Sequence, residues 1–226
     1  MKFAVIGIGY FGAALARELS ESGHEVLAID LAEAQMREIR DVVTLAAVAD
    51  GTDIVALEQL GVAEVDTAVV SIGEGFEASL VVTAHLQKLG VPKVHVRIIN
   101  EVHERLLDLM GVSGTIRAED LAATYFSRQI MNESVHRYFG IDRDHAIVEL
   151  ALPDSLDGKT LEQSELRSRH RINAITVRRP VGPKAGDGAT YATGGTLGPD
   201  FVLHAGDRLI VFGRFRDIEA FCGTAG

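Results

Sequence analysis

Short apolar runs alternate with longer amphipathic stretches through the first 133 residues of the chain. The apolar runs predict strands at residues 3–8, 25–29, 42–48, 67–72, 94–98 and 114–117. The stretches between them predict helices at residues 11–22, 31–40, 53–60, 78–89 and 101–110. Four of these helices are followed by a glycine that suits a left-handed C-cap: Gly23, Gly61, Gly90 and Gly111. Strands that are apolar throughout and alternate with helices predict a parallel sheet covered on both faces.

The rest of the chain has a different pattern. Residues 119–137 predict one more helix, serving as a crossover or an interface helix. A smaller module follows, with strands at 146–152, 172–177 and 207–213 and short helices at 159–167 and 215–222. Residues 180–200 hold six glycines and three prolines, which predict a long flexible loop or a loose hairpin. The fold class is therefore α/β, a Rossmann-like doubly wound parallel sheet with a second, smaller α+β C-terminal domain.

Length and charge support a division into two domains. The chain has 226 residues, enough for one large domain or two small ones. Residues 1–133 hold 10 Lys or Arg and 20 Asp or Glu, whereas residues 134–226 hold 12 of each. We expect domains at residues 1–135 and 140–226, with the boundary near 134–143. The net charge of −10 argues against nucleic acid as the main partner, since phosphate binding needs a basic face.

Composition also indicates the cellular environment of the chain. A single cysteine, Cys222, excludes a disulfide framework and a thiolate zinc cluster. No window of about 18 uncharged apolar residues predicts a membrane span. Glycines interrupt the apolar run at the N-terminus, which predicts a first strand rather than a signal peptide. These features predict an intracellular, reducing environment.

The first predicted turn carries a glycine fingerprint. Gly7, Gly9 and Gly12 form G-x-G-x-x-G after a predicted strand and at the start of a predicted helix. In such a motif the first glycine permits the tight turn, the second admits a pyrophosphate and the third lets helix and strand pack closely. The helix N-terminus offers free N–H groups to phosphates. Asp30, at the end of the second strand, can accept hydrogen bonds from ribose hydroxyls and would repel a 2′-phosphate, so NADP is disfavoured.

Further candidates follow from the rule that ligands bind at the carboxyl edge of such a sheet. Within the glycine motif, Tyr10 and Phe11 would lie beside a bound nucleotide. The other candidates stand at strand ends, where each can equally be structural: Asp50, Gly51, Thr52, Ser71, Gly73 and Arg97.

The sequence shows no catalytic group that could act together with a bound nucleotide cofactor. A nicotinamide dehydrogenase needs an acid–base residue near the reacting carbon, and none of the eight histidines stands in a recognisable catalytic motif. Ser-His-Asp, HExxH and Walker signatures are also missing. We therefore predict a protein that is not an enzyme and has no catalytic residues. A small NAD-dependent oxidoreductase and an empty scaffold remain as alternatives.

Longer stretches of the chain resemble a known family. The N-terminal part, with FAVIGIGYFG, HEVLAID, ADGTD and DTAVVSIGE, is similar to RCK domains, the regulators of potassium conductance. It looks like KtrA/TrkA-type cytosolic subunits of bacterial potassium uptake systems, with a TrkA-N domain. The later pattern GKTL, INAITV and GDRLIVFG resembles their C-terminal ligand-binding domain, TrkA-C, and is more specific than the glycine motif.

The resemblance implies a nucleotide-sensing regulatory subunit. Such proteins bind ATP or ADP in the N-terminal domain, with NAD as an alternative here, and control potassium flux through a membrane-embedded subunit similar to KtrB or TrkH. They are cytoplasmic and peripheral on the inner face of the membrane, where dimers assemble into an octameric ring. Exchange of ATP for ADP changes the ring, which is differential affinity of a ligand for two states.

The resemblance also implies roles for particular residues. Glu119 matches a glutamate that helps hold a divalent cation, Mg or Ca, near the nucleotide phosphates, although an acid there also suits a helix N-terminus. Tyr10 departs from the family, which often has arginine at this place, and weakens the case for ATP over ADP or NAD. Related C-terminal domains bind cyclic di-AMP, and Arg167 and Pro199 match positions that contact it. The glycine-rich insert at 180–200 departs from the family's short hairpin.

Overall fold

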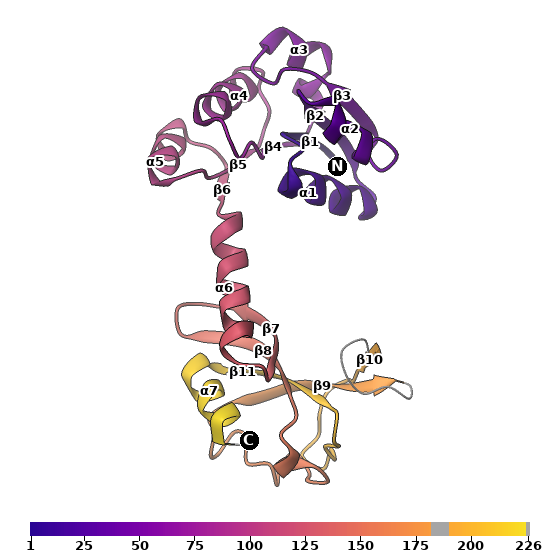
Figure 1. Cartoon of the computed structure of the whole chain (residues 1–226), viewed down its shortest axis with the longest axis vertical. Helices are drawn as coiled ribbons and strands as arrows, with labels where there is room; N and C mark the ends of the chain where they lie inside the picture. The colour runs from indigo at the N-terminus through magenta and orange to yellow at the C-terminus, as the bar shows by residue number, and fades with distance from the viewer. Residues whose placement is uncertain (182–189, 225–226) are drawn as a thin grey trace. The chain divides into compact units, whose positions relative to one another are not determined.

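The computed structural model describes residues 1–181 and 190–224 (Figure 1). The chain divides into two compact units, Met1–Glu119 and a second that begins at Asp120. This division lies at the start of helix α6 (Ala118–Met131), whereas the sequence pattern led us to expect a boundary after that helix.

The first unit is a parallel sheet between two layers of helices. Its strand order is β3-β2-β1-β4-β5-β6, and the order confirms the predicted fold class of a doubly wound parallel sheet. The strands are β1 (Lys2–Ile6), β2 (Glu25–Asp30), β3 (Leu45–Val48), β4 (Thr67–Val70), β5 (Val94–Arg97) and β6 (Gly114–Ile116). The helices are α1 (Tyr10–Glu21), α2 (Glu33–Ile39), α3 (Ile54–Gln59), α4 (Phe76–Lys88) and α5 (Glu101–Met110), with a 3-10 turn η1 (Val62–Glu64).

Two buried clusters explain why the strands are apolar throughout. On one face of the sheet, Ile6 of β1 joins Leu57, Leu86 and other side chains from α3, α4 and α5. On the other face, Val5 of the same strand joins Met36 and other side chains from α1 and α2. Successive residues of a strand point to opposite faces, so a sheet covered on both sides needs apolar residues at every position. The glycines after α1, α4 and α5 and after Leu60 all have positive φ, as predicted.

The second unit is built around an antiparallel sheet. Its described strands have the order β10-β9-β11-β8-β7, and every pairing among them is antiparallel. The strands are β7 (Val135–Gly140), β8 (His145–Ala151), β9 (Asn173–Val181), β10 (Thr190–Thr193) and β11 (Arg208–Arg214). A 3-10 turn η2 (Asp154–Leu156) and helix α7 (Phe215–Thr224) accompany them. Alternate residues Val148 and Leu150 of β8 pack with Leu209 of β11 and Ile218 of α7 in one core. The predicted α+β class is thus confirmed.

The prediction of one helix over residues 119–137 was too long. Helix α6 ends at Met131, and the chain turns into β7, a strand that the pattern did not predict. Asn132 makes this turn, since its side chain accepts from the Ser134 amide (3.0 Å) and its carbonyl from the Val135 amide (2.9 Å). Short polar side chains of this kind offer the backbone an alternative to the helix.

The prediction of a helix at residues 159–167 was wrong. Residues 161–170 form successive turns instead. The Leu161 amide donates to the Phe201 carbonyl (2.8 Å) and the Glu162 amide to the Pro199 carbonyl (2.9 Å), so a distant segment takes their hydrogen bonds. Glu165 has φ of 50°, which a continuous α-helix does not allow.

Of the loop or loose hairpin predicted for residues 180–200, the described part agrees with the second, since it contains two antiparallel strands. Strand β9 continues to Val181, and Thr190 pairs with it at the start of β10. Residues 182–189 of the predicted loop lie outside the described part.

Within residues 1–181 and 190–224, no helix has the length and hydropathy that a membrane span needs.

Cys222 is expected to react slowly with iodoacetamide near neutral pH. Burial raises the pKa of its thiol above the usual value, although a hydrogen bond with Asn132 acts in the opposite direction. Because the thiolate is the nucleophile, a raised pKa leaves less of the reactive form, and labelling should accelerate as the pH rises. Mass spectrometry of the labelled chain measures this, with free cysteine as control; equal rates at pH near 7 would contradict the prediction.

Candidate nucleotide-binding site

The predicted site residues of the first unit lie at the carboxyl edge of its sheet. Strands β1 and β4 are neighbours, although the chain passes through β2 and β3 between them (Figure 1). At this switch point the connections from the two strands leave to opposite faces, which opens a crevice for ligands in folds of this kind. The structure thereby brings the turn after β1 together with the ends of β2, β4 and β5.

Gly7 and Gly12 hold the turn after β1 in a shape that other residues would not fit. Gly7 has φ of 93°, and a Cβ on it would lie 2.9 Å from the Ile72 amide nitrogen. A Cβ on Gly12 would overlap the Gly7 carbonyl oxygen and lie 2.6 Å from Ser71 Oγ. Ser71, predicted as a ligand contact, donates its hydroxyl to that carbonyl (2.5 Å) and is itself buried. Ser71 thus fixes the glycine turn from β4.

Gly9, unlike Gly7 and Gly12, has open space beside it. A Cβ on it would meet no described atom within 4 Å, and it precedes the first residue of α1. No described side chain caps α1 at this end. The first turn of a helix has N–H groups without intrahelical partners and a partial positive charge, so open space here suits an anion.

Asp30 ties the second strand to the glycine turn. The Ile8 amide donates to its Oδ2 (2.6 Å), and the Ala32 amide donates to its Oδ1 (2.8 Å). Each carboxylate oxygen has a further lone pair, so both can still accept from a ribose hydroxyl. The sequence predicted Asp30 as a site residue, but no pattern in it indicates that the Ile8 amide donates to this carboxylate.

The Asp50–Gly51–Thr52 segment follows β3 and is held in shape locally. Asp50 accepts from the Thr52 amide (2.9 Å) and the Thr52 hydroxyl (2.7 Å), and these bonds hold its pKa below the usual value. A Cβ on Gly51 would lie 2.9 Å from a methyl of Ile6, so the chain passes close to β1 here.

Arg97 and Glu119 form an ion pair that the sequence did not predict. The Arg97 guanidinium donates to Glu119 and lies 5.8 Å from the centre of the Phe11 ring. It also covers Gly73, where a Cβ would lie 2.8 Å from its Nη1. Hydrogen bonding from Arg97 lowers the pKa of Glu119, so this carboxylate is ionised at neutral pH. Arg97 Nε is buried without a partner among the described residues, so this donor of the guanidinium is unused there.

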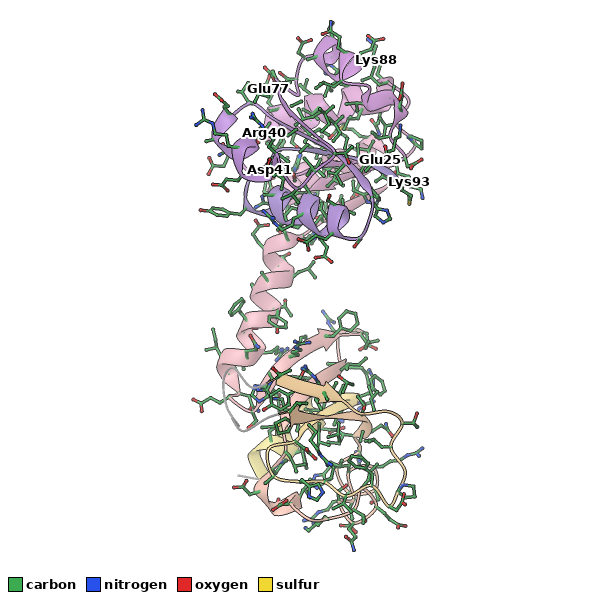
Figure 2. The ribbon with its side chains drawn as sticks, turned by 90° about the vertical axis from the view of Figure 1, so that its right-hand side faces the viewer. Glu25, Arg40, Asp41, Glu77, Lys88 and Lys93 are labelled. Carbon is green, nitrogen blue, oxygen red and sulfur yellow. The ribbon has the colours of Figure 1, made fainter. Side chains whose placement is uncertain are left out.

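Tyr10 is fully exposed at the first position of α1, so its ring contacts little of the protein. The charged side chains of the first unit are scattered over its surface. Figure 2 labels six of them, all on exposed residues: Glu25, Arg40, Asp41, Glu77, Lys88 and Lys93.

The described residues contain no group of three His, Cys, Asp or Glu side chains that could hold a metal ion. Glu119 by itself would offer a cation a single carboxylate, and in the structure that carboxylate forms an ion pair with Arg97.

Arg167 and Pro199, the predicted second-ligand residues, lie in the second unit. Arg167 is exposed and lines a cavity of about 440 Å³ with Glu162 and Glu165. Pro199 is exposed as well, and its carbonyl accepts from the Glu162 amide. The structure therefore brings both residues near Glu162, Arg167 through the shared cavity and Pro199 through this hydrogen bond.

Comparisons with known proteins match this architecture. Residues 3–118, nearly the whole first unit, match the TrkA-N domain. The chain is 32% identical over 224 residues to Ktr system potassium uptake protein C of Bacillus subtilis, covering 97% of this chain and 95% of the relative. The chain belongs to the KtrA/TrkA-like RCK family. Ktr system potassium uptake protein A of the same organism is 28% identical over 220 residues, with the same shares covered.

Solved structures agree on the fold. The GsuK RCK domain has a TM-score of 0.62 at 18% identity, covering all of this RCK chain and 47% of that chain. The GsuK channel bound to NAD has a TM-score of 0.58 at the same identity, with 39% of that chain covered. At this identity the likeness supports an RCK fold and nothing finer.

Proposed function

We propose that this chain is the nucleotide-sensing regulatory subunit of a bacterial potassium transporter or channel. The observation that carries the proposal is the open space at Gly9, before the uncapped start of α1 and beside Asp30. Two relatives that the chain matches over nearly its full length are potassium uptake proteins of Ktr systems. A sensor needs a ligand site but no catalytic residues, which agrees with the absence of a catalytic motif in the sequence.

The ligand we propose is ATP or ADP, with NAD as the alternative. Its phosphates would lie at the N-terminus of α1, its ribose would donate to Asp30, and Asp50 with Thr52 would border the adenine. Arg97, the last residue of β5, lies near this end of the sheet and would meet the outer phosphates. Tyr10 carries no charge, so it gives no preference for the terminal phosphate of ATP. One structural neighbour binds NAD, which keeps that ligand open.

The residues present fit a divalent cation only together with the nucleotide. Mg²⁺ is commonly held by one or two carboxylates plus substrate phosphates, and Glu119 can supply one carboxylate. When bound, such an ion would neutralise phosphate charge. The ion pair between Arg97 and Glu119 would then break. Arg97 would donate to phosphate oxygens, and the Glu119 carboxylate would help to hold the cation.

Control of potassium flux would follow from the place of Glu119 in the chain. It stands one residue after the start of α6, the helix that leads out of the first unit. A ligand that binds one arrangement of Glu119 better than the other shifts the population of α6 arrangements. We propose that dimers in an octameric ring pass this shift to a membrane-embedded KtrB- or TrkH-like subunit. The protein would then be cytoplasmic and peripheral at the membrane, and a cyclic di-AMP site at Arg167 and Pro199 would add a second input.

Replacing Asp30 with alanine is expected to weaken ATP and ADP binding at least tenfold. Hydrogen bonds to a charged acceptor contribute about 1.5–3 kcal/mol each, and the variant loses those from the ribose. Calorimetric titration of the purified chain measures the affinities, and Asp41→Ala, an exposed acid of the same unit, is the matched control.

Asp30→Asn helps to separate binding from folding, because its amide oxygen can still accept from Ile8, although the bond from Ala32 is lost. Its melting temperature should fall less than that of Asp30→Ala, while nucleotide affinity falls in both. Equal affinity in both Asp30 variants and the parent would refute the nucleotide site. Turnover of NAD with a hydroxy or carbonyl substrate would favour the oxidoreductase instead.

A further inference from the structure

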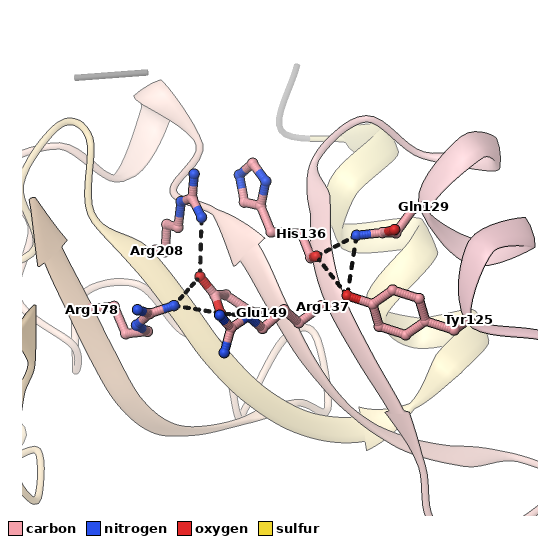
Figure 3. A network of polar contacts seen from close by, with 7 residues as sticks. All are labelled: Tyr125, Gln129, His136, Arg137, Glu149, Arg178 and Arg208. Atoms are coloured by element: carbon pink, nitrogen blue, oxygen red, sulfur yellow. Dashed lines mark hydrogen bonds and ion pairs between the residues drawn. The ribbon is translucent and has the colours of Figure 1, made fainter. Parts of the chain in front are cut away.

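One buried carboxylate in the second unit is surrounded by three arginines. Glu149 lies on β8, between core residues Val148 and Leu150, and points to the opposite face of the sheet. Both of its oxygens accept from Arg178 Nη1 at 3.0 Å, and Oε1 accepts from Arg208 Nη1 at 3.3 Å (Figure 3). The Nε of Arg137 on β7 lies 3.5 Å from Oε2. Through the Glu149 carboxylate, the cluster links side chains of four strands: β7, β8, β9 and β11.

The charges of this cluster do not balance. Among the described residues, three guanidinium groups face a single carboxylate, which leaves two positive charges over. The side chains of Arg178 and Arg208 are only 18% and 17% exposed, and that of Glu149 is 3% exposed, so water screens them poorly. The ring of Tyr191 lies 4.0 Å from Arg208 and 5.6 Å from Arg178 and offsets part of the charge. Partly buried positive charge without a counter-charge attracts an anion.

A cavity of about 420 Å³ lies beside the cluster. Arg137, Arg178 and Glu149 line it, and Glu149 is the acid among the described lining residues. Apolar side chains line it as well, including Phe139 and Ile147. Phe139 is 66% exposed, which is high for so large an apolar side chain. Guanidinium donors beside an apolar wall suit a molecule with one anionic end and one apolar part.

We propose that this cavity binds a small organic anion, whose carboxylate or phosphate contacts Arg137 and Arg178 while its apolar part packs on Phe139 and Ile147. The site lies wholly within the second unit. It shares no residue with the nucleotide site at Asp30 or with the residues matched to cyclic di-AMP. An experiment on this cavity therefore tests a claim that does not depend on the proposed function.

Phenyl phosphate and benzoate are suitable probes, with inorganic phosphate and benzyl alcohol beside them. Calorimetric titration of the full chain should show one equivalent of an aromatic anion bound, with benzyl alcohol at least about tenfold weaker because it has no charge for the guanidiniums. Comparing phenyl phosphate with benzoate identifies which anionic group the site prefers. Inorganic phosphate should bind more weakly than phenyl phosphate, since it has no apolar part.

Arg137→Gln is the decisive variant. The Arg137 side chain is 69% exposed and its contact with Glu149 is long, so the fold should survive its loss. It should weaken binding of the preferred aromatic anion about tenfold. Arg214→Gln removes an exposed arginine of β11 outside the cavity lining and should leave binding unchanged. Phe139→Ala should weaken the aromatic anion while leaving inorganic phosphate as it was.

Three results would overturn the proposal. The first is absence of anion binding at probe concentrations of about 10 mM, near the limit of useful affinity. The second is binding that Arg137→Gln leaves intact, because the anion would then sit elsewhere, for example at the start of α1. The third is an Arg137→Gln protein that loses self-association in sedimentation but keeps its anion affinity, which would make the cluster an interface between copies.

Discussion

Gly12→Ala is expected to destabilise the first unit by at least about 3 kcal/mol, at the upper end of what overpacking costs. The added Cβ would overlap the Gly7 carbonyl oxygen and approach Ser71 Oγ. Neither group can move cheaply, because Gly7 belongs to the turn and Ser71 is buried and bonded to it. Helix α1 would have to shift off the sheet. Denaturant unfolding followed by circular dichroism measures the loss, and nucleotide affinity should fall with it.

Gly9→Ala is the matched control for this change. It adds the same methyl group three residues earlier in the motif, where a Cβ would meet no described atom. Its stability should stay within about 0.5 kcal/mol of the parent, as for a surface change without contacts. Nucleotide affinity should still fall, since the methyl occupies the space proposed for the phosphates. Equal stability of the two variants would show that α1 does not pack on the turn as described.

The sequence could predict the first unit because its local signals agree with one another. Apolar strands, glycines after helices and the G-x-G-x-x-G turn all give the same register, and each is a short-range property of the chain. The three glycines have the three surroundings that their order implies: Gly7 in a left-handed turn, Gly9 open and Gly12 tightly packed.

The errors arose where distant segments decide the structure. Residues 159–167 have helical spacing, yet the amides of Leu161 and Glu162 donate to carbonyls of the segment around Phe201. Strand β7 exists because β8 is there to pair with it, and Asn132 ends the preceding helix with a turn that spacing alone does not reveal. Propensity is a weak prior against such tertiary contacts.

Within the candidate site, the sequence proposed residues but did not indicate which of them contact one another. Ser71 was a candidate for either a ligand contact or a structural role, and in the structure its hydroxyl donates to the Gly7 carbonyl of the glycine turn. Arg97 and Glu119 were separate candidates, and the structure joins them. Strand ends bring such residues to one edge, but which side chains meet there depends on sheet order, which single-sequence patterns do not give.

Charge placement gives these relations a physical meaning. The acidic surplus of the chain lies in residues 1–133, which repels a polyphosphate over the surface of the first unit. Local positive potential must therefore come from the start of α1 and from Arg97. Because Glu119 neutralises Arg97 in the structure, the phosphate of the proposed nucleotide would compete with that carboxylate, and the ion pair would couple its binding to the start of α6.

Glu149→Ala is expected to destabilise the second unit by about 3–5 kcal/mol, the usual cost of removing one partner from a buried ion pair. Arg178 and Arg208 would keep their mostly buried charges without the carboxylate that now faces both. Hydrogen exchange read by mass spectrometry measures the change locally. Peptides from β8, β9 and β11 should exchange at least about 100-fold faster when they open with the unit.

The first unit provides an internal reference for this experiment, since its peptides should keep their exchange rates. Glu162→Ala, at an exposed acid of the same second unit, should leave β8 and β11 unchanged as well. Unaltered exchange in Glu149→Ala would mean that the three arginines do not depend on that carboxylate. If adding the preferred organic anion slows exchange of these strands in the parent chain, the missing counter-charge is one that a ligand can supply, because binding to the folded state alone stabilises it.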